Sequence, residues 1–305
     1  MGLNPKDIIV ADTIHQVSRR SFLRSGLLLG GAAALGTLGF ASYEPYELSL
    51  TTLDLRLPRV PAEFDGFRLV QISDLHFGEY IREEHVAAVV ERVNRLRPDL
   101  VVITGDFVTA PHAARLRRKA AQQIWPCALV LKGMRATHGV FATLGNHDAE
   151  TDPDLITEAL KENGTEVLRN EARPIEVRGA RLWLAGLDDA SNGGADPARA
   201  LQRIPHGEPA VLAVHEPDFA DVVSKYAVDL QISGHSHGGQ VRLPLIGAPY
   251  LPEMARKYPI GLRNLGPLQL YTNRGIGVVG APFRLMCPPE VTLFRFACTR
   301  ERKYL

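Results

Sequence analysis

Cysteine is scarce in this 305-residue chain, and neither sign of charge predominates. Three cysteines, Cys127, Cys287 and Cys298, are too few and too scattered for a disulfide framework or a zinc finger. We expect unpaired buried thiols, with one bridge such as Cys287–Cys298 as the alternative. The 35 basic residues nearly balance the 34 acidic ones, so the basic excess of nucleic-acid-binding proteins is absent. We therefore expect no nucleic-acid binding.

Long hydrophobic runs are also lacking, with one exception near the N-terminus. Residues 25–43 are uncharged over about 19 residues, close to the minimum for crossing a bilayer, but five glycines make them only mildly hydrophobic. Arg19-Arg20 followed by Phe22-Leu23 resembles the twin-arginine consensus, and Gly39-Phe40-Ala41 provides a small-x-small ending. We predict that residues 1–41 are an export signal read by the twin-arginine translocase. The alternative is a buried Gly/Ala helix of the domain.

This signal predicts a protein of the periplasm or cell envelope, and an uncleaved signal would anchor it to the membrane. Residues 42–305 are long enough for one large domain. Their composition, with 45% apolar and 23% charged residues in the whole chain, is that of a globular protein and excludes disordered, collagen-like and coiled-coil classes.

Apolar runs of strand length alternate with helical patterns along the predicted domain. Pro and Gly punctuate residues 244–267, which predicts a long ordered loop that either forms an apolar rim for lipid-like substrates or packs against the body. The pattern predicts an α/β fold with strands in two packed sheets. We expect strands at 47–57, 67–72, 100–103, 140–144, 166–168, 174–177, 182–187, 210–214, 228–232, 240–243, 268–272 and 291–297, and helices at 86–96, 113–133, 153–162 and 217–225.

Five predicted strands end in the same way, with an apolar run followed by residues that commonly ligate metals. Because ligands in α/β folds bind beyond the carboxyl ends of strands, we expect the five endings to converge. Half of the ten histidines lie in these endings rather than on helix faces and loops. The endings are Asp74-Leu75-His76, Gly105-Asp106, Gly145-Asn146-His147-Asp148, His215 and Gly234-His235-Ser236-His237.

The donor types in these endings indicate the kind of metal site. Asp74 and His76 are two residues apart on chain that we expect to be extended, so both side chains can reach one metal, and His235 and His237 share this spacing. Imidazole, carboxylate and amide donors without thiolates suit zinc, manganese or iron. The full set of donors is too large for one tetrahedral zinc and fits two divalent ions that share a carboxylate.

The ordered motifs resemble the calcineurin-like metallophosphoesterase superfamily over residues 66–298. Within it, the GHSHGGQ run and residues 273–277 and 287–290 fit the bacterial branch of exported phosphodiesterases of the YkuE/YaeI type. The resemblance implies a four-layer α/β/β/α sandwich of two mixed β-sheets with flanking helices. It also implies a phosphoester hydrolase, with a phosphoester as its substrate.

The resemblance also implies a role for each motif residue. Asp74, His76 and His237 would hold one metal, Asp106 would bridge both, and Asn146, His215 and His235 would complete the second site. A metal-bridging hydroxide would attack phosphorus. His147 would be the general acid for the leaving oxygen, and Asp148 would orient its imidazole.

Several alternatives remain open at this level. A pyrophosphohydrolase of a nucleotide-activated, UDP-diacylglucosamine-type glycolipid competes with a phosphodiesterase, and its substrate would be lipid-linked. A non-catalytic metal-binding scaffold is a further alternative, although such a protein has no use for a general acid at His147. Arg274 is a candidate for substrate binding because a guanidinium matches the geometry of phosphate, whereas its alternative role is a structural ion pair.

Overall fold

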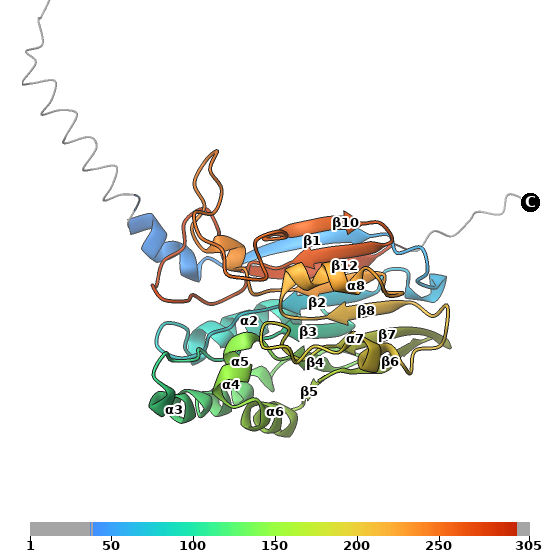
Figure 1. Ribbon diagram of the computed structural model, residues 1–305, viewed down its shortest axis with the longest axis horizontal. Helices are drawn as coiled ribbons and strands as arrows, with labels where there is room; N and C mark the ends of the chain where they lie inside the picture. Colours follow the sequence, from blue (N-terminus) through green and yellow to red (C-terminus); the bar gives the residue numbers. More distant parts are fainter. Residues whose placement is uncertain (1–36, 38, 298–305) are drawn as a thin grey trace, which may run out of the picture. The chain divides into compact units, whose positions relative to one another are not determined.

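Strands and helices alternate along the chain in the computed structural model, which describes residue 37 and residues 39–297 (Figure 1). The twin-arginine motif and Cys298 lie outside the described residues. A compact unit begins at Ala41. Among the described residues, no helix combines the length and apolar character needed to cross a membrane.

Two mixed sheets of six strands each form the centre of this unit. The first has the order β1-β12-β2-β3-β4-β5, with β1 Ser49–Leu55, β2 Arg68–Ile72, β3 Leu100–Thr104, β4 Val140–Thr143, β5 Thr165–Val167 and β12 Glu290–Phe296. The second has the order β10-β11-β9-β8-β7-β6, with β6 Glu171–Val177, β7 Ala180–Gly186, β8 Ala210–Ala213, β9 Leu230–Ser233, β10 Gly261–Leu265 and β11 Leu268–Thr272. Only the pairs β12–β2, β10–β11 and β6–β7 are antiparallel.

Helices cover the outer face of each sheet, which confirms the predicted four-layer sandwich (Figure 1). Because successive side chains of a strand point to opposite faces, Val101 and Ile103 of β3 pack under the helices while Val102 packs against the second sheet. The first sheet is covered by α2 Glu83–Arg95, α4 Ile124–Leu131 and α6 Pro153–Glu162, and the second by α7 Pro197–Leu201 and α8 Ala220–Val223. The remaining helical elements of the described residues are α3 Arg117–Ala121, α5 Asn146–Thr151, η1 Glu44–Tyr46, η2 Ala62–Phe64, η3 Ala114–Leu116, η4 Pro217–Phe219 and η5 His237–Gly239.

The helix predicted over 113–133 is broken, and this expectation is wrong in its detail. It divides into η3, α3 and α4, and Leu116, the last residue of η3, is 44% exposed. Pro126 explains the break before α4, because it has no N–H to donate to the carbonyl of Gln122 and its ring would clash there. A proline is tolerated in the first turn, so α4 begins at Ile124.

The segment after the GHSH motif also differs from expectation. Residues 240–243 form no strand; Val241 makes only an isolated bridge with Leu285. The strand of this region is β10, which lies inside the predicted loop and pairs antiparallel with β11. Period-2 alternation over four residues is a weak signal, and pairing with a partner decides whether such a run becomes a strand. Cys127 and Cys287 are buried free thiols, as expected.

Candidate metal centre

The carboxyl ends of strands from both sheets meet at one edge of the sandwich. The turn after β2 bonds to the turn after β3, with Asp74 N donating to Gly105 O at 2.9 Å. The turn after β9 reaches across from the second sheet, with His235 N donating to Asp74 Oδ1 at 3.0 Å. Gly234 permits this approach, because a Cβ there would collide with Ser73 Oγ and Asp74 Oδ2. Gly234 N donates to His215 O of the turn after β8 at 2.9 Å, and His147 N of the turn after β4 donates to Asp106 Oδ1 at 3.0 Å. The five motif endings therefore converge.

The ligand side chains are presented by strained turns rather than by extended chain. Asp74 and His76 have φ values of 52° and 47°, in the left-handed region that residues other than glycine seldom adopt. Our explanation of their spacing by extended backbone is therefore wrong, although both side chains do face the same spot while Leu75 between them is fully buried. Such strain is typical of functional sites. Positive φ values recur at Asp106, His235 and His237.

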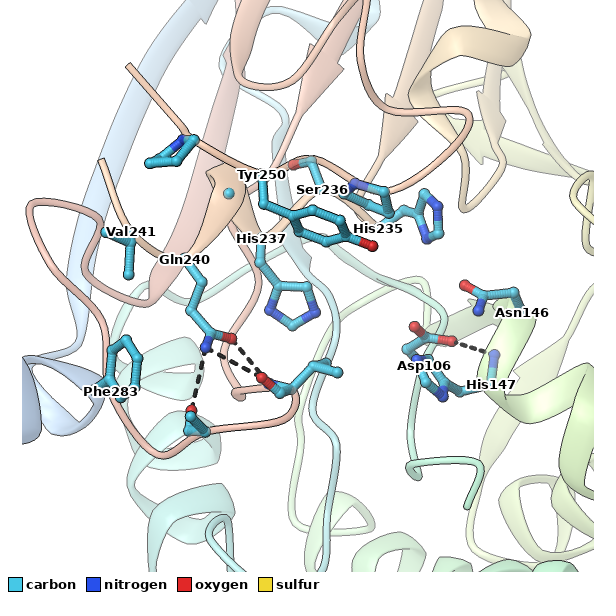
Figure 2. Close-up of a pocket in the computed structure, with 15 residues that line it drawn as sticks. Asp106, Asn146, His147, His235, Ser236, His237, Gln240, Val241, Tyr250 and Phe283 are labelled. Atoms are coloured by element: carbon cyan, nitrogen blue, oxygen red, sulfur yellow. Dashed lines mark hydrogen bonds between the residues drawn. The ribbon is translucent and has the colours of Figure 1, made fainter. Parts of the chain in front are cut away.

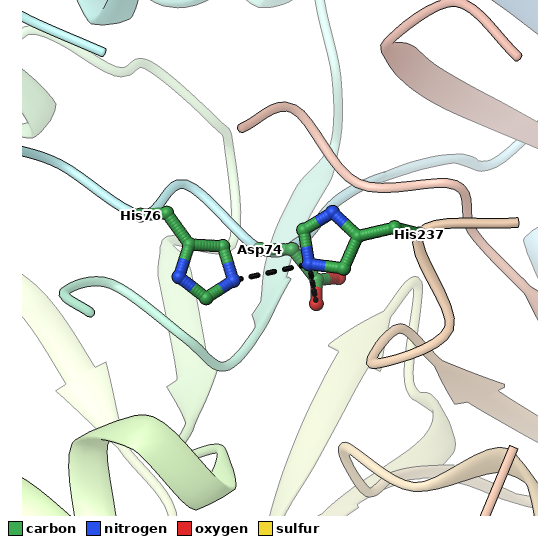
Figure 3. Close-up of side chains that lie close together, drawn as sticks. All are labelled: Asp74, His76 and His237. Carbon is green, nitrogen blue, oxygen red and sulfur yellow. Dashed lines mark hydrogen bonds and ion pairs between the residues drawn. The ribbon is translucent and has the colours of Figure 1, made fainter. Parts of the chain in front are cut away.

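Asp74, His76 and His237 form the first cluster (Figure 3). His76 Nε2 lies 3.1 Å from His237 Nε2, and His237 Nε2 lies 3.3 Å from Asp74 Oδ1. Their ligand atoms lie within 4.8 Å of one another, which is compatible with one ion between them.

Asp106, His215 and His235 form the second cluster. His215 Nε2 lies 3.1 Å from Asp106 Oδ2, and the same oxygen lies 3.5 Å from His76 Nε2 of the first cluster. Asp106 therefore stands between the two clusters, as a bridging carboxylate must. Its other oxygen accepts the backbone N–H of His147 at 3.0 Å (Figure 2).

Polar partners behind the imidazoles assign a tautomer to two of them. His215 Nδ1 lies 2.6 Å from the carbonyl of Thr104, and His235 Nε2 lies 2.8 Å from the carbonyl of Glu253. Because a carbonyl only accepts, these nitrogens carry hydrogens. When each ring is neutral, His215 Nε2 and His235 Nδ1 are free to ligate. His76 Nδ1 meets Thr109 Oγ1 at 3.0 Å.

Burial shapes the protonation of the cluster. It lowers the pKa of His76 to about 3 and, together with the neighbouring His76, lowers the pKa of His237 well below its usual range. It raises the pKa of Asp74 to about 6. Burial alone would raise the pKa of Asp106 and lower that of His215, but their mutual attraction outweighs it and shifts both in the opposite sense. The neutral imidazoles of His76 and His237 are in the protonation state that binds metals.

One buried atom without a hydrogen-bond partner tests whether the site suits metal ions. This atom is Asn146 Oδ1, which belongs to the predicted ligand set. Buried polar atoms are nearly always paired, so an unpaired lone pair aimed into a cluster of carboxylates and imidazoles fits a cation. The donors are oxygen and nitrogen only, which suits first-row divalent metals.

His147 and Asp148 lie beside the clusters with different partners. His147 Nδ1 accepts the backbone N–H of Ala110 at 3.0 Å, so its hydrogen is on Nε2 when the ring is neutral. Asp148, which we expected to orient this ring, instead accepts backbone N–H groups from Asp106, Phe107, Val108 and Gly145. The ring of His147 is thus oriented by backbone, and the expected contact with Asp148 is wrong.

Two cavities adjoin the site from different sides and share His147. The first, about 610 Å³, is lined by Asp106, Asn146 and His237 together with apolar side chains such as Tyr250 and Phe283 (Figure 2). The second, about 500 Å³, is lined by His76, Glu79, Tyr80, His112 and Ala120, among others. His147 and Val279 border both, so a molecule bound at the metal centre has room for two substituents.

This geometry agrees with a family comparison. The model of the calcineurin-like phosphoesterase family matches residues 67–239, which carry every predicted metal ligand. The chain belongs to the calcineurin-like phosphoesterases. It is a hydrolase of phosphoester bonds, and members of the family use divalent metals.

Relatives of this phosphoesterase match along nearly the whole chain. The metallophosphoesterase YkuE of Bacillus subtilis is 34% identical over 94% of this chain and 100% of its own length. Phosphodiesterase YaeI of Escherichia coli is 28% identical over 91% of this chain and 98% of its own. The UDP-2,3-diacylglucosamine pyrophosphatase LpxG of Chlamydia muridarum is 28% identical over 83% of this chain and 90% of its own.

Two arginines of this phosphoesterase make structural contacts near the metal centre. Arg274 does not line either of these cavities; it forms an ion pair with the buried Glu290, with Nε 3.1 Å from Oε2, so the structural alternative holds. The residue that sequence reasoning missed is Arg284, which is fully buried and places Nη2 3.4 Å from His237 Nδ1. The sequence does contain an indication of its role, because Arg284 is the lone charged residue between Arg274 and Glu290.

Proposed function

We propose that this phosphoesterase hydrolyses phosphodiesters, with one divalent ion in each cluster and His147 as the general acid. One observation carries the preference for diesters: the two cavities meet at His147, so a phosphorus atom bound there can carry an organic group on each side. A monoester would leave one cavity without a ligand group. The match to phosphodiesterase YaeI supports the same class.

The residues divide the work as follows. Asp74, His76 and His237 would hold one ion, with Asp106 shared between the two clusters. His215, His235 and Asn146 would hold the other. Two bound divalent ions would neutralise the phosphoryl oxygens and make water nucleophilic near neutral pH. His147 supplies a proton from Nε2 to the leaving oxygen, because Nδ1 is occupied by the N–H of Ala110.

Activity of the metal-loaded protein against mono-, di- and pyrophosphate esters tests this proposal. We expect kcat/KM to be highest for diesters. Ala120→Phe, which fills the second cavity without touching the ligands, should lower diester hydrolysis and spare p-nitrophenyl phosphate, a monoester. Ala281→Phe is the matched change in the first cavity. A preference for monoesters, or equal losses on both ester classes in each variant, would contradict the proposal.

A pyrophosphohydrolase of a nucleotide-activated glycolipid is the second candidate. The match to LpxG supports it, as does the apolar wall of the first cavity. In this case, the cavity would take the lipid side of the substrate and the second cavity the nucleotide side. Hydrolysis of UDP-2,3-diacylglucosamine at a higher kcat/KM than any diester would favour this candidate.

For localisation, we propose export to the cell envelope by the twin-arginine translocase. Arg19-Arg20, Phe22-Leu23 and the glycine-rich uncharged stretch support it. An uncleaved signal would leave the enzyme attached to the membrane.

A further inference from the structure

We propose that an apolar rim beside the first cavity docks on a lipid bilayer and presents the metal centre to membrane-embedded substrates. The rim consists of exposed side chains on two neighbouring segments: Leu243, Leu245, Ile246, Tyr250, Phe283 and Met286. The part of this inference that concerns the substrate rests on the proposed function. The docking surface rests on the rim and on the point at which the chain enters this unit.

Hydrogen bonds hold the two segments of the rim together. Arg242 N donates to Leu285 O at 2.8 Å, and Leu285 N donates to Gln240 O at 3.0 Å. The side chain of Gln240 extends the link, with Nε2 donating to Val279 O and Ala281 O at 3.2 Å each (Figure 2). The exposed side chains therefore belong to one rigid surface rather than to separate loops.

The tip of the rim is a short hairpin. Leu243 and Gly247 exchange backbone hydrogen bonds at 2.8 and 2.9 Å, and Figure 1 shows this region projecting from the sheets. At its tip, Leu245 is fully exposed, at 108%, and Ile246 is 72% exposed. Leu245 also has a φ of 67°, where a turn favours glycine or asparagine. A leucine at this position carries backbone strain and exposes an apolar side chain to water. Burial of that side chain in lipid would offset the free-energy cost of both.

The rim residues carry no charge, and residues 243–252 contain no charged residue. Arg242, directly before the hairpin, is half-buried and its Nη1 donates to Gly238 O at 2.9 Å. Arg284 on the second segment is fully buried and bonds to backbone carbonyls, including Gly277 O at 2.6 Å. Glu44 nearby is buried, with its carboxylate accepting the N–H groups of Met286 and Cys287. An apolar, uncharged projection fits the acyl region of a bilayer better than a polar protein surface.

The position at which the chain enters this unit favours a membrane over a second copy of the chain. Arg284 N donates to Ala41 O at 2.9 Å, so the chain enters beside Phe283 and Met286 of the rim. The uncharged residues 25–43 lead directly to this point. A membrane that holds the N-terminal segment would therefore lie next to the rim.

The same surface indicates where the substrate enters. Tyr250 and Phe283 of the rim also line the first cavity, together with Val241. A phosphodiester with an acyl-chain arm could therefore pass from the bilayer to the metal centre along apolar side chains. Its polar arm would occupy the second cavity, which is lined by Glu79 and His112.

Tryptophan quenching tests the docking surface directly. Full-length Leu245→Trp protein is reconstituted with phosphatidylethanolamine/phosphatidylglycerol vesicles that carry brominated acyl chains. We expect quenching of the introduced tryptophan beyond that of the native tryptophans. The matched control is Leu129→Trp, because Leu129 is 64% exposed on α4, at the opposite edge in Figure 1. Equal quenching in the two variants, or none in Leu245→Trp, would overturn the docking surface whether or not the protein hydrolyses diesters.

Kinetics test its consequence for the substrate. Leu245→Ser/Ile246→Ser should lower hydrolysis of a vesicle-embedded acyl phosphodiester by roughly tenfold or more, since burying one such side chain is worth at least that factor. Hydrolysis of soluble bis-p-nitrophenyl phosphate should be unchanged, because neither residue lines the cavity. Leu129→Ser is the control. If the unaltered protein is instead a dimer without lipid and the double variant a monomer, the rim is a dimer interface and the proposal is wrong.

Discussion

Asp148 accepts the backbone N–H of Asp106 at 2.8 Å, and so holds the turn that presents the shared carboxylate of the metal centre. Its two oxygens also accept the N–H groups of Phe107, Val108 and Gly145. Asp148 is fully buried. It therefore positions Asp106 through the backbone rather than acting on the substrate.

Replacement of Asp148 by Asn should consequently affect metal binding and stability together. The new amide group leaves at least one buried N–H of the turn without an acceptor, which costs about 1–3 kcal/mol. We expect a lower melting temperature and reduced metal content, measured by calorimetry and elemental analysis. Glu158→Gln, at an exposed position, is the control. Full metal content combined with an altered leaving-group dependence would return Asp148 to the role of orienting His147.

The metal content itself distinguishes the shared ligand from the others. We expect close to two divalent ions per chain after reconstitution with manganese or zinc. Asp106→Asn should lower the occupancy of both sites, because Oδ2 lies 3.1 Å from His215 Nε2 and 3.5 Å from His76 Nε2. His76→Ala should chiefly lower the occupancy of the first cluster, to which His76 belongs. A protein that retains no metal under any of these conditions would exclude the proposed centre.

His147→Ala separates a general acid from a metal ligand. We expect the variant to keep its fold and metals while turnover falls by about 10²–10⁴-fold, the usual contribution of a positioned acid. The loss should be largest for alkyl esters, whose leaving alkoxide needs the proton most, and smaller for nitrophenyl esters. Equal losses for both, or loss of metal, would place His147 among the ligands, as its distance from His76 and Asp106 permits.

Arg274 should contribute to stability rather than to substrate affinity. Its partner Glu290 is buried, so Arg274→Met leaves this carboxylate without its counter-charge, while Tyr271 and the backbone N–H of residue 274 still donate to it. Breaking such a pair costs on the order of 3 kcal/mol. Denaturation should show this loss while KM for diesters is unchanged, and Arg274→Lys should be milder. A raised KM at unchanged stability would return Arg274 to substrate binding.

Export can be tested without knowledge of the substrate. Arg19→Lys/Arg20→Lys keeps the charge but removes the paired guanidinium groups of the twin-arginine motif. We expect folded protein to accumulate in the cytoplasm, detected by cell fractionation and immunoblotting. Unchanged envelope localisation of this double variant would be incompatible with the proposed route.

The sequence by itself determined the architecture and the identity of the candidate ligands. Apolar strands such as 67–72 and 100–103 have a period and length that local chemistry specifies, and donors at the ends of parallel strands must share one edge of the sheet. For this reason, the order of residues along the chain is enough to group Asp74 and Asp106, which follow the paired strands β2 and β3, whereas His215 follows β8 of the other sheet and joins them only because the two sheets pack together.

Only the tertiary structure decided which partner each side chain takes. Asp148 bonds to backbone rather than to the adjacent His147, Arg274 pairs with Glu290, and Arg284 is buried behind His237. These contacts join residues distant in sequence, or depend on left-handed turns that neighbouring residue types do not dictate. The same holds for the two cavities and the rim, because they arise where separate loops pack, and sequence periodicity reports only the face of a single element.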